Sequence, residues 1–211
     1  MNPVLAVLAA MGLLWAAPAA AQGSGKPNLA KGESIAKQVC AACHAPDGNS
    51  PTPANPKLAG QFADYLHKQL LDFGPRDGKK AARANAIMAG MVASLSDADM
   101  RAVAAYYAAQ TLRPAAASDK DLAAQGQRLW RGGIAAKGVA ACSGCHGPDG
   151  AGIPGRYPRL SGQYAQYLEA QLKLFRDGAR ANDPNGMMRG VAARMSDQEI
   201  KAAAEYAAGL R

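Results

Sequence analysis

The feature that most constrains this chain of 211 residues is an internal repeat. Residues 40–44 align with residues 142–146, and each segment reads Cys-x-x-Cys-His. At the same offset, residues 56–61 align with residues 158–163, which share the pattern Pro-x-Leu-x-Gly-Gln. Self-similarity on this scale means that one structural unit is written twice. The chain is therefore expected to fold as two homologous domains.

The repeat also predicts the domain boundaries. We expect an N-terminal domain at residues 22–111, a linker at 112–119 and a C-terminal domain at 120–211. The linker contains a proline followed by small residues, a composition typical of connecting segments.

Residues 1–21 have the pattern of a secretory signal peptide. An apolar run is followed by small residues, with Ala19 and Ala21 three and one positions before a cleavage site ahead of Gln22. We therefore predict export, with a mature protein that begins at Gln22. Because this segment lacks Lys and Arg, an uncleaved membrane anchor is the alternative.

The pattern within each copy is helical. Residues 61–73 place apolar side chains at helical spacing, and Asn28 can cap a helix that leads toward the first Cys-x-x-Cys-His segment. Ser96-x-x-Asp99 and Ser196-x-x-Glu199 are capping boxes, which open the last helix of each copy. No segment shows a convincing alternation of polar and apolar residues. The predicted fold class is all-α.

Charge and aromatic content narrow the class of protein. The formal net charge is +8, and both halves are equally basic. This favours encounters with acidic protein faces or anionic lipid surfaces, whereas nucleic acid is not an expected partner of an exported protein. Aromatic residues make up only 6% of the chain. Since small domains have a limited apolar core, a large flat cofactor would supply what these two lack.

The two Cys-x-x-Cys-His segments specify that cofactor. A c-type haem is attached by thioether bonds from two cysteines, and the next histidine binds its iron. Cysteines three apart lie on one face of a helical turn, which holds the histidine beneath the metal. The sequence therefore predicts two covalently bound haem c groups. Their attachment points would be Cys40, Cys43, Cys142 and Cys145, with His44 and His146 as the proximal iron ligands.

Other uses of the four cysteines are a zinc site shared by both copies and two redox-active Cys-x-x-Cys pairs. In an exported chain, four cysteines would ordinarily suggest two disulfides. None of these alternatives requires a histidine directly after each pair.

The distal iron ligands follow from the repeat. Outside the two motifs the chain has one histidine, His67, which we expect at the surface of its helix, and its partner position holds Glu169. Two bis-histidine haems are therefore impossible within one chain. Of the methionines beyond residue 21, only Met88 and Met188 coincide, and we predict that they are the distal ligands. A thioether favours ferrous iron and raises the reduction potential.

Neighbouring residues supply alternatives and supporting groups. Met91 and Met187 are the methionines that would replace the predicted pair if the alignment were wrong. A ligating histidine usually donates its second N–H to a carbonyl, and Pro56 and Pro158 are candidates to accept it. The alternative is that these prolines only shape a turn.

Both domains share a Pro-x-Leu-x-Gly-Gln segment, and Met88 and Met188 are each followed by x-Gly. The second domain also contains the run Arg189-Gly190-Val191-Ala192. With these features, the chain closely resembles the dihaem cytochromes c4. The resemblance covers essentially all of residues 28–211. It implies two tandem class I cytochrome c domains, each a small helical bundle wrapped around a covalent haem. The haem propionate edges would face one another across the domain interface.

The resemblance also implies a function. Such a protein is a periplasmic carrier of single electrons, not an enzyme, between a quinol-oxidising complex and terminal oxidases or reductases. Loose membrane association is known in this family, and we expect a monomer.

Two rival functions stay open. One is the dihaem electron-transfer subunit of a larger dehydrogenase, such as a sulfide-oxidising flavocytochrome, because such subunits share the fold and the motifs. The other is a dihaem peroxidase, which must leave one iron open to bind peroxide. Methionine at both equivalent positions disfavours the peroxidase.

Overall fold

The computed structural model describes residues 26–76 and 78–211. The predicted signal peptide, with its alternative as an anchor, lies outside these residues. None of the described helices is both long enough and apolar enough to cross a lipid bilayer.

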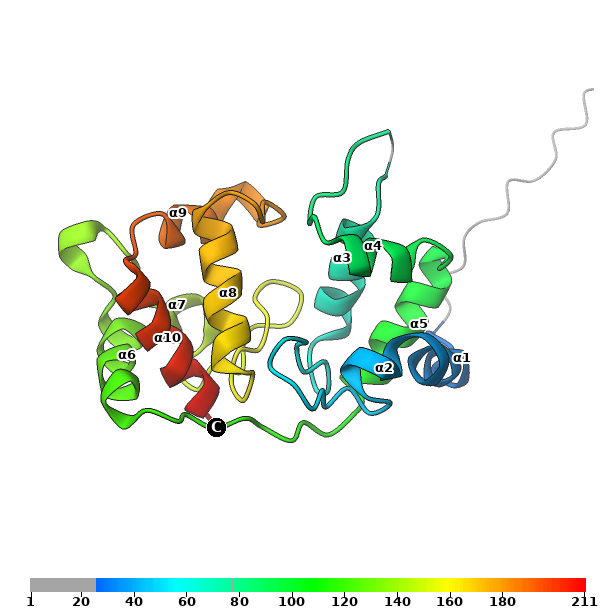
Figure 1. The fold of residues 1–211 in the computed structure, drawn as a ribbon, viewed down its shortest axis with the longest axis horizontal. Coiled ribbons are helices and arrows are strands. Elements are labelled where there is room, and N and C mark those ends of the chain that lie inside the picture. Colours follow the sequence, from blue (N-terminus) through cyan, green and yellow to red (C-terminus); the bar gives the residue numbers. More distant parts are fainter. Residues whose placement is uncertain (1–25, 77) are drawn as a thin grey trace, which may run out of the picture.

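Two groups of helices lie side by side, joined by an extended connection (Figure 1). The described residues contain isolated β-bridges but no named strand, so the all-α prediction is confirmed. The first group contains α1 (Leu29–Ile35), α2 (Ala41–His44), α3 (Ala63–Phe73), α4 (Ala86–Val92) and α5 (Asp97–Ala108), with a π-helical turn at Ala36–Cys40. The second contains α6 (Lys120–Gly132), α7 (Ser143–His146), α8 (Ala165–Arg176), α9 (Met187–Ala192) and α10 (Asp197–Gly209), with 3-10 turns at Ala135–Lys137 and Pro184–Gly186.

The first and last helices of each domain cross backbone to backbone. α1 packs on α5, and α6 packs on α10. A Cβ atom at Gly32 would lie 2.2 Å from the carbonyl oxygen of Ala102, and one at Gly126 would lie 2.0 Å from that of Ala202. Only glycine lets the helices approach this closely.

Most of the predicted helix starts are confirmed. Asn28 caps α1 by accepting from the Lys31 N–H at 3.0 Å. Ser96 and Ser196 form complete capping boxes with Asp99 and Glu199. The helix expected from residue 61 instead begins at Ala63, because the backbone of Phe62 is extended and forms the N-cap.

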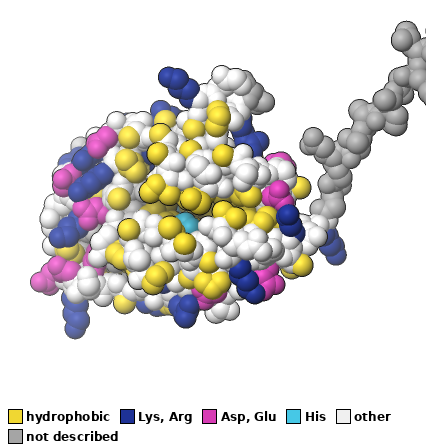
Figure 2. Space-filling model, turned by 45° about the vertical axis from the view of Figure 1, so that its right-hand side comes forward, with side chains coloured by type: hydrophobic (Ala, Val, Ile, Leu, Met, Phe, Trp, Pro, Cys, Tyr) yellow, Lys and Arg dark blue, Asp and Glu magenta, His cyan; other side chains and the backbone are white. Residues whose placement is uncertain are grey.

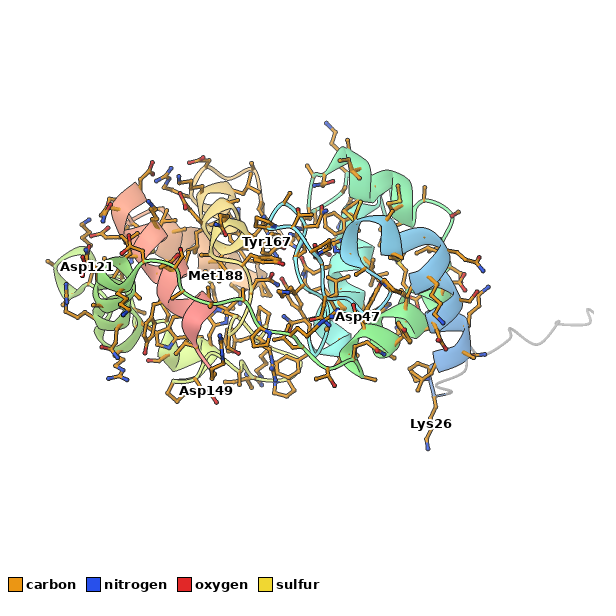
Figure 3. The ribbon with its side chains drawn as sticks, turned by 60° about the horizontal axis from the view of Figure 1, so that its bottom comes forward. Lys26, Asp47, Asp121, Asp149, Tyr167 and Met188 are labelled. Atoms are coloured by element: carbon orange, nitrogen blue, oxygen red, sulfur yellow. The ribbon has the colours of Figure 1, made fainter. Side chains whose placement is uncertain are left out.

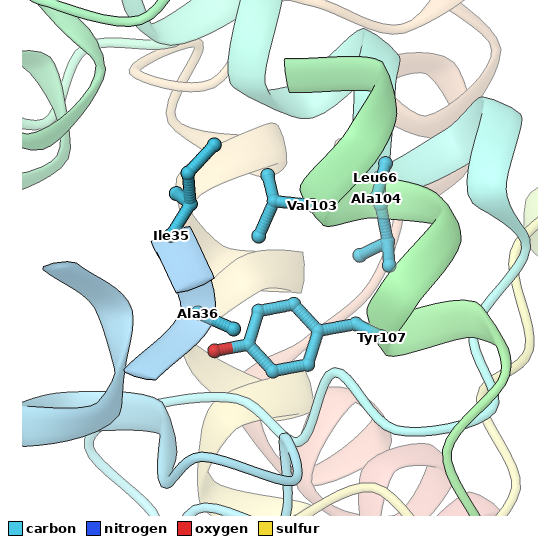
Figure 4. Close-up of a cluster of buried hydrophobic side chains, with 6 residues drawn as sticks. All are labelled: Ile35, Ala36, Leu66, Val103, Ala104 and Tyr107. Carbon is cyan, nitrogen blue, oxygen red and sulfur yellow. The ribbon is translucent and has the colours of Figure 1, made fainter. Parts of the chain in front are cut away.

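Small hydrophobic clusters hold each domain together. Figure 4 shows one of them, in which Tyr107 of α5 packs with Ile35 and Ala36 near the end of α1. Its counterpart in the second domain is built around Trp130, whose indole N–H donates to the Gly147 carbonyl at 3.1 Å. These clusters tie the outer helices to the loops that follow the Cys-x-x-Cys-His segments.

The linker predicted at residues 112–119 is held along its length. The Arg113 N–H donates to Asn49 Oδ1 at 2.6 Å, and the Asp119 N–H donates to Glu205 Oε1 at 2.7 Å. Between them, the Ala115 N–H donates to the Gly162 carbonyl at 2.8 Å. The connection is therefore bonded to both domains.

Candidate haem-binding sites

Each predicted proximal histidine is buried and oriented by a proline carbonyl. His44 ends α2 and is 7% exposed, and His146 ends α7 and is 6% exposed. The Nδ1 atom of His44 lies 3.0 Å from the Pro56 carbonyl oxygen, and that of His146 lies 3.0 Å from the Pro158 carbonyl oxygen. Since a carbonyl can only accept, Nδ1 carries the proton and Nε2 keeps its lone pair for a metal.

The ionisation of both imidazoles suits a metal ligand. Burial lowers the pKa of His44 and of His146, and the hydrogen bonds to the proline carbonyls oppose this only partly. Both rings are therefore neutral at pH 7, as metal coordination requires.

The four cysteines are free thiols, with no disulfide between them. Burial raises the pKa of Cys142 to about 11 and also raises that of Cys40. Redox-active Cys-x-x-Cys pairs need a lowered thiol pKa, so this alternative is disfavoured. A shared zinc site is disfavoured as well, because residues 26–76 and 78–211 contain no group of three or more His, Cys, Asp or Glu placed to hold a metal ion.

Met88 is the better placed of the two candidate methionines in the first domain. It lies on α4, half-buried, and packs against the cluster formed by Phe73, Val92 and Met100. Its N–H donates to Asn85 Oδ1 at 2.9 Å, which fixes the start of α4. Met91, one turn later, is 42% exposed.

Met188 has the corresponding position in the second domain. It is half-buried on α9 and lies within its domain in Figure 3, whereas Met187 is 40% exposed. The carboxylate of Asp183 accepts from the Arg189 N–H at 2.9 Å and from its Nε at 2.8 Å. Burial alone would raise the pKa of Asp183, but these hydrogen bonds outweigh it and keep the pKa below its ordinary value. The helix that carries Met188 is thus anchored.

In each domain, the helix that ends in the predicted histidine ligand and the helix that carries the predicted methionine ligand are separated along the vertical direction of Figure 1. α2 lies low and α4 high in the right-hand domain of Figure 1, and α7 and α9 repeat this order on the left. A group bound between these two helices would have the histidine on one side and the methionine on the other.

His67 is less exposed than expected. Its side chain is 13% exposed, and Nε2 lies 2.9 Å from Asp97 Oδ1. The contact ties α3 to the start of α5, a structural task.

Two glutamines at the domain interface were missed by the sequence analysis. Gln61 Oε1 accepts from the Arg159 N–H at 3.0 Å, and its Nε2 donates to the Arg159 carbonyl at 2.9 Å. Gln163 makes the reciprocal pair with Lys57, at 2.9 Å for each bond. Their only signal is that both end the repeated Pro-x-Leu-x-Gly-Gln segment.

Two arginines join the domains at a second point. Arg83 donates to Tyr167 Oη at 2.9 Å and to Gln171 Oε1 at 2.8 Å. Arg180 donates in the opposite direction, to Tyr65 Oη at 3.2 Å. Tyr167 lies on the side of its domain that faces the other domain (Figure 3).

The residues present fit a c-type haem. Figure 2 shows a histidine side chain in a hollow bordered by hydrophobic side chains, which suits a porphyrin face. Each domain offers two free thiols, a buried neutral imidazole and a half-buried thioether. Arg159 Nε is buried and donates to no acceptor within the described residues, so an anionic group such as a propionate would satisfy it.

Comparisons with known proteins agree with this fit. The family model for cytochrome c matches residues 29–109 and 123–210. The chain is 52% identical over 194 residues to cytochrome c4 from Thiocapsa roseopersicina, covering 91% of this chain and 96% of that protein. It is 41% identical over 211 residues to a thiosulfate dehydrogenase electron acceptor from Thiomonas intermedia (strain K12), covering 99% and 91%. The crystal structure of reduced recombinant cytochrome c4 from Pseudomonas stutzeri superposes with a TM-score of 0.81 at 42% identity, covering 87% of this chain and 99% of that one.

Proposed function

Because the chain belongs to the cytochrome c family, and within it to the cytochromes c4, we propose that it is a periplasmic carrier of single electrons. Its donor would be a quinol-oxidising complex, and its acceptors would be terminal oxidases or reductases. The two domains carry two covalently bound haem c groups, each of which supplies an iron that cycles between the ferric and ferrous states.

Specific residues would hold these groups. We assign thioether attachment to Cys40 and Cys43 in the first domain and to Cys142 and Cys145 in the second. Iron ligation is assigned to His44 with Met88 and to His146 with Met188. In this assignment, Pro56 and Pro158 orient the two imidazoles through their carbonyl oxygens.

One observation carries the proposal: both domains contain the same complete donor set. Each has a buried neutral histidine oriented by a proline carbonyl, and each has a half-buried methionine on an anchored helix. With a histidine and a methionine assigned to each iron, neither iron would have an open position for peroxide. This supports a carrier over a peroxidase.

The net charge of the chain supports the proposal that its partners are proteins. A formal net charge of +8 favours docking to acidic faces of a donor and an acceptor. The proposal also includes cleavage before Gln22, export to the periplasm, and domain boundaries at 22–111, 112–119 and 120–211.

The test uses the holoprotein purified from its native host, together with membranes of that host. We expect reduction by the quinol-oxidising complex and oxidation by the membranes, with rates that fall as ionic strength rises. Peroxide turnover with a reduced donor would contradict the carrier function. A periplasmic fraction without the protein would contradict the localisation.

A second function is favoured by the 41% identity to a thiosulfate dehydrogenase electron acceptor. On this alternative, the chain accepts electrons from a dehydrogenase, either as a free acceptor or as its tightly bound subunit. Gel filtration from the native host separates these cases. A stable complex with a flavin-containing or haem-containing dehydrogenase would identify a subunit, and a single peak at the size of the monomer would identify a free carrier.

A further inference from the structure

Each proximal histidine is connected to the opposite domain through a single peptide group. His44 donates from Nδ1 to the Pro56 carbonyl oxygen at 3.0 Å. The N–H of the same peptide group belongs to Lys57 and donates to Gln163 Oε1 at 2.9 Å. The hydrogen-bond chain therefore runs from an imidazole of the first domain to a side chain of the second.

The second domain mirrors this arrangement. His146 donates to the Pro158 carbonyl oxygen at 3.0 Å, and the N–H of that peptide group, on Arg159, donates to Gln61 Oε1 at 3.0 Å. Two crossed chains of equal length thus pass through the interface.

The glutamines are held firmly in these chains. Both are buried, and each Oε1 also accepts the N–H of the following residue, at 3.0 Å from Phe62 and 3.1 Å from Tyr164. A small pocket of about 10 Å³, partly open to solvent, is lined by both side chains and has barely the room that one water molecule needs. Because the glutamines themselves are buried, their hydrogen bonds are electrostatically stronger than they would be in water.

Hydrogen bonds in a chain polarise one another. When the peptide N–H donates to a glutamine oxygen, the carbonyl oxygen of that peptide becomes a stronger acceptor. It then draws more strongly on the Nδ1–H of the histidine, and the ring becomes a more basic ligand. A more basic imidazole stabilises ferric iron and lowers the reduction potential.

We propose that Gln61 and Gln163 are crossed positioning residues, each of which lowers the reduction potential of the haem in the other domain. The inference rests on the assignment of His44 and His146 as iron ligands. It makes each potential depend on the docking of the two domains, because the acceptor at the end of each chain belongs to the opposite one.

The experiment compares the full-length holoproteins Gln163→Met and Gln61→Met with the unmodified protein. Methionine keeps the length of the side chain but cannot accept strongly from the peptide N–H. A redox titration followed by the NMR signals of each haem's methyl groups reports the two potentials separately. We expect Gln163→Met to raise only the N-terminal potential and Gln61→Met to raise only the C-terminal one. A tenfold change in the redox equilibrium constant, about 59 mV for one electron, is the upper end of the expected shift.

A matched control and a second variant test whether general loosening of the interface could explain the shifts. Tyr164→Phe removes another bond between the domains, from Tyr164 Oη to the Ser50 carbonyl at 2.6 Å, and should leave both potentials unchanged. Gln163→Glu keeps an acceptor for the Lys57 N–H, loses the donor to the Lys57 carbonyl and adds a negative charge that favours ferric iron in both haems. If the hydrogen-bond chain acts as proposed, the N-terminal potential should fall more than the C-terminal one. Equal falls would show an effect of charge alone and would contradict the proposal.

Three results would overturn the inference: a shift in the variant's own domain, equal shifts in both domains, or no shift while hydrogen exchange at the Lys57 amide accelerates. Failure of the proposed function looks different. In that case the unmodified protein itself would lack a histidine–methionine spectrum at one or both haems.

Discussion

Arg180 Nη2 lies 3.0 Å from Gln69 Oε1, so a buried guanidinium of the second domain is bonded to an amide of the first. Arg180 also donates to Tyr65 Oη and to Gln171 Oε1. These acceptors are neutral, and the charge of the arginine is spread over several oxygens. Together with Arg83, this side chain determines how the two domains dock at this point.

Replacing Arg180 by Leu should weaken the docking of the domains. Arg83 still donates to Gln69 and Gln171, but Tyr65 Oη and the buried Asn182 Oδ1 lose the donor that Arg180 supplies, at a cost of about 1–3 kcal/mol for each. We expect calorimetry to resolve two unfolding transitions in place of one, and small-angle scattering to show a larger radius of gyration. Arg176→Leu loses only contacts within its own domain, with Asp177 and Asp197, and should change neither. An unchanged single transition in Arg180→Leu would show that the interface does not depend on this side chain.

Met88→Ala and Met188→Ala should each abolish half of the far-red methionine–iron absorption band and lower one reduction potential. The reason is that each removes the soft, neutral ligand of one haem. Met91→Ala and Met187→Ala are the matched controls, one beside each ligand, and should leave the band intact. If a control loses the band instead, the assignment of that domain's ligand is wrong.

Gly126→Ala should destabilise the second domain, because its Cβ atom would lie 2.0 Å from the carbonyl oxygen of Ala202. Helices α6 and α10 would have to move apart, and overpacking of this kind costs about 1–3 kcal/mol. Gly132→Ala, on the same helix, meets nothing within 4 Å and should be neutral or slightly stabilising. Urea denaturation of both variants measures the difference. Equal midpoints would contradict the close helix crossing.

The capping box of α10 should make stability depend on pH in acid. Hydrogen bonds from Lys137, at 2.7 and 2.8 Å, and from the Ser196 N–H hold the pKa of Glu199 below its ordinary value. A lowered folded-state pKa means that the carboxylate stabilises the fold above its unfolded pKa of about 4.3 and loses this contribution as pH falls through the folded value.

Glu199→Gln removes that charge and keeps the shape of the side chain. The difference in unfolding free energy between the unmodified protein and the variant should be largest near neutral pH and should shrink below about pH 4. Denaturant titrations across this range provide the measurement. Parallel curves would mean that the carboxylate charge contributes nothing.

Local features of the fold were predictable from the residues alone. The capping boxes at Ser96 and Ser196 and the cap at Asn28 depend on side chains three residues from their partners, so a short window of sequence contains the whole interaction. The contacts of Pro56 and Pro158 were also anticipated, because a histidine that binds a metal needs an acceptor for its second N–H.

The interface was not predictable in this way. The repeat pairs Arg180 with Lys80 and Arg83 with Asp183, so nothing in the alignment indicates that the two arginines meet. Gln61 was assigned to a helix because its neighbours have helical spacing, but its side chain binds a backbone that is 98 residues away. Contacts at such a separation depend on how two finished domains dock.

The sequence by itself determined the cofactor, because the attachment chemistry is local and each Cys-x-x-Cys-His segment contains it in five adjacent residues. The helical spacing and capping boxes determined the all-α fold, and the repeat as a whole determined the family. Only the tertiary structure decided that each histidine is linked to a glutamine of the opposite domain. That link exists because docking brings the buried side chain of each glutamine against the backbone of the other domain, where buried polar groups are hydrogen-bonded.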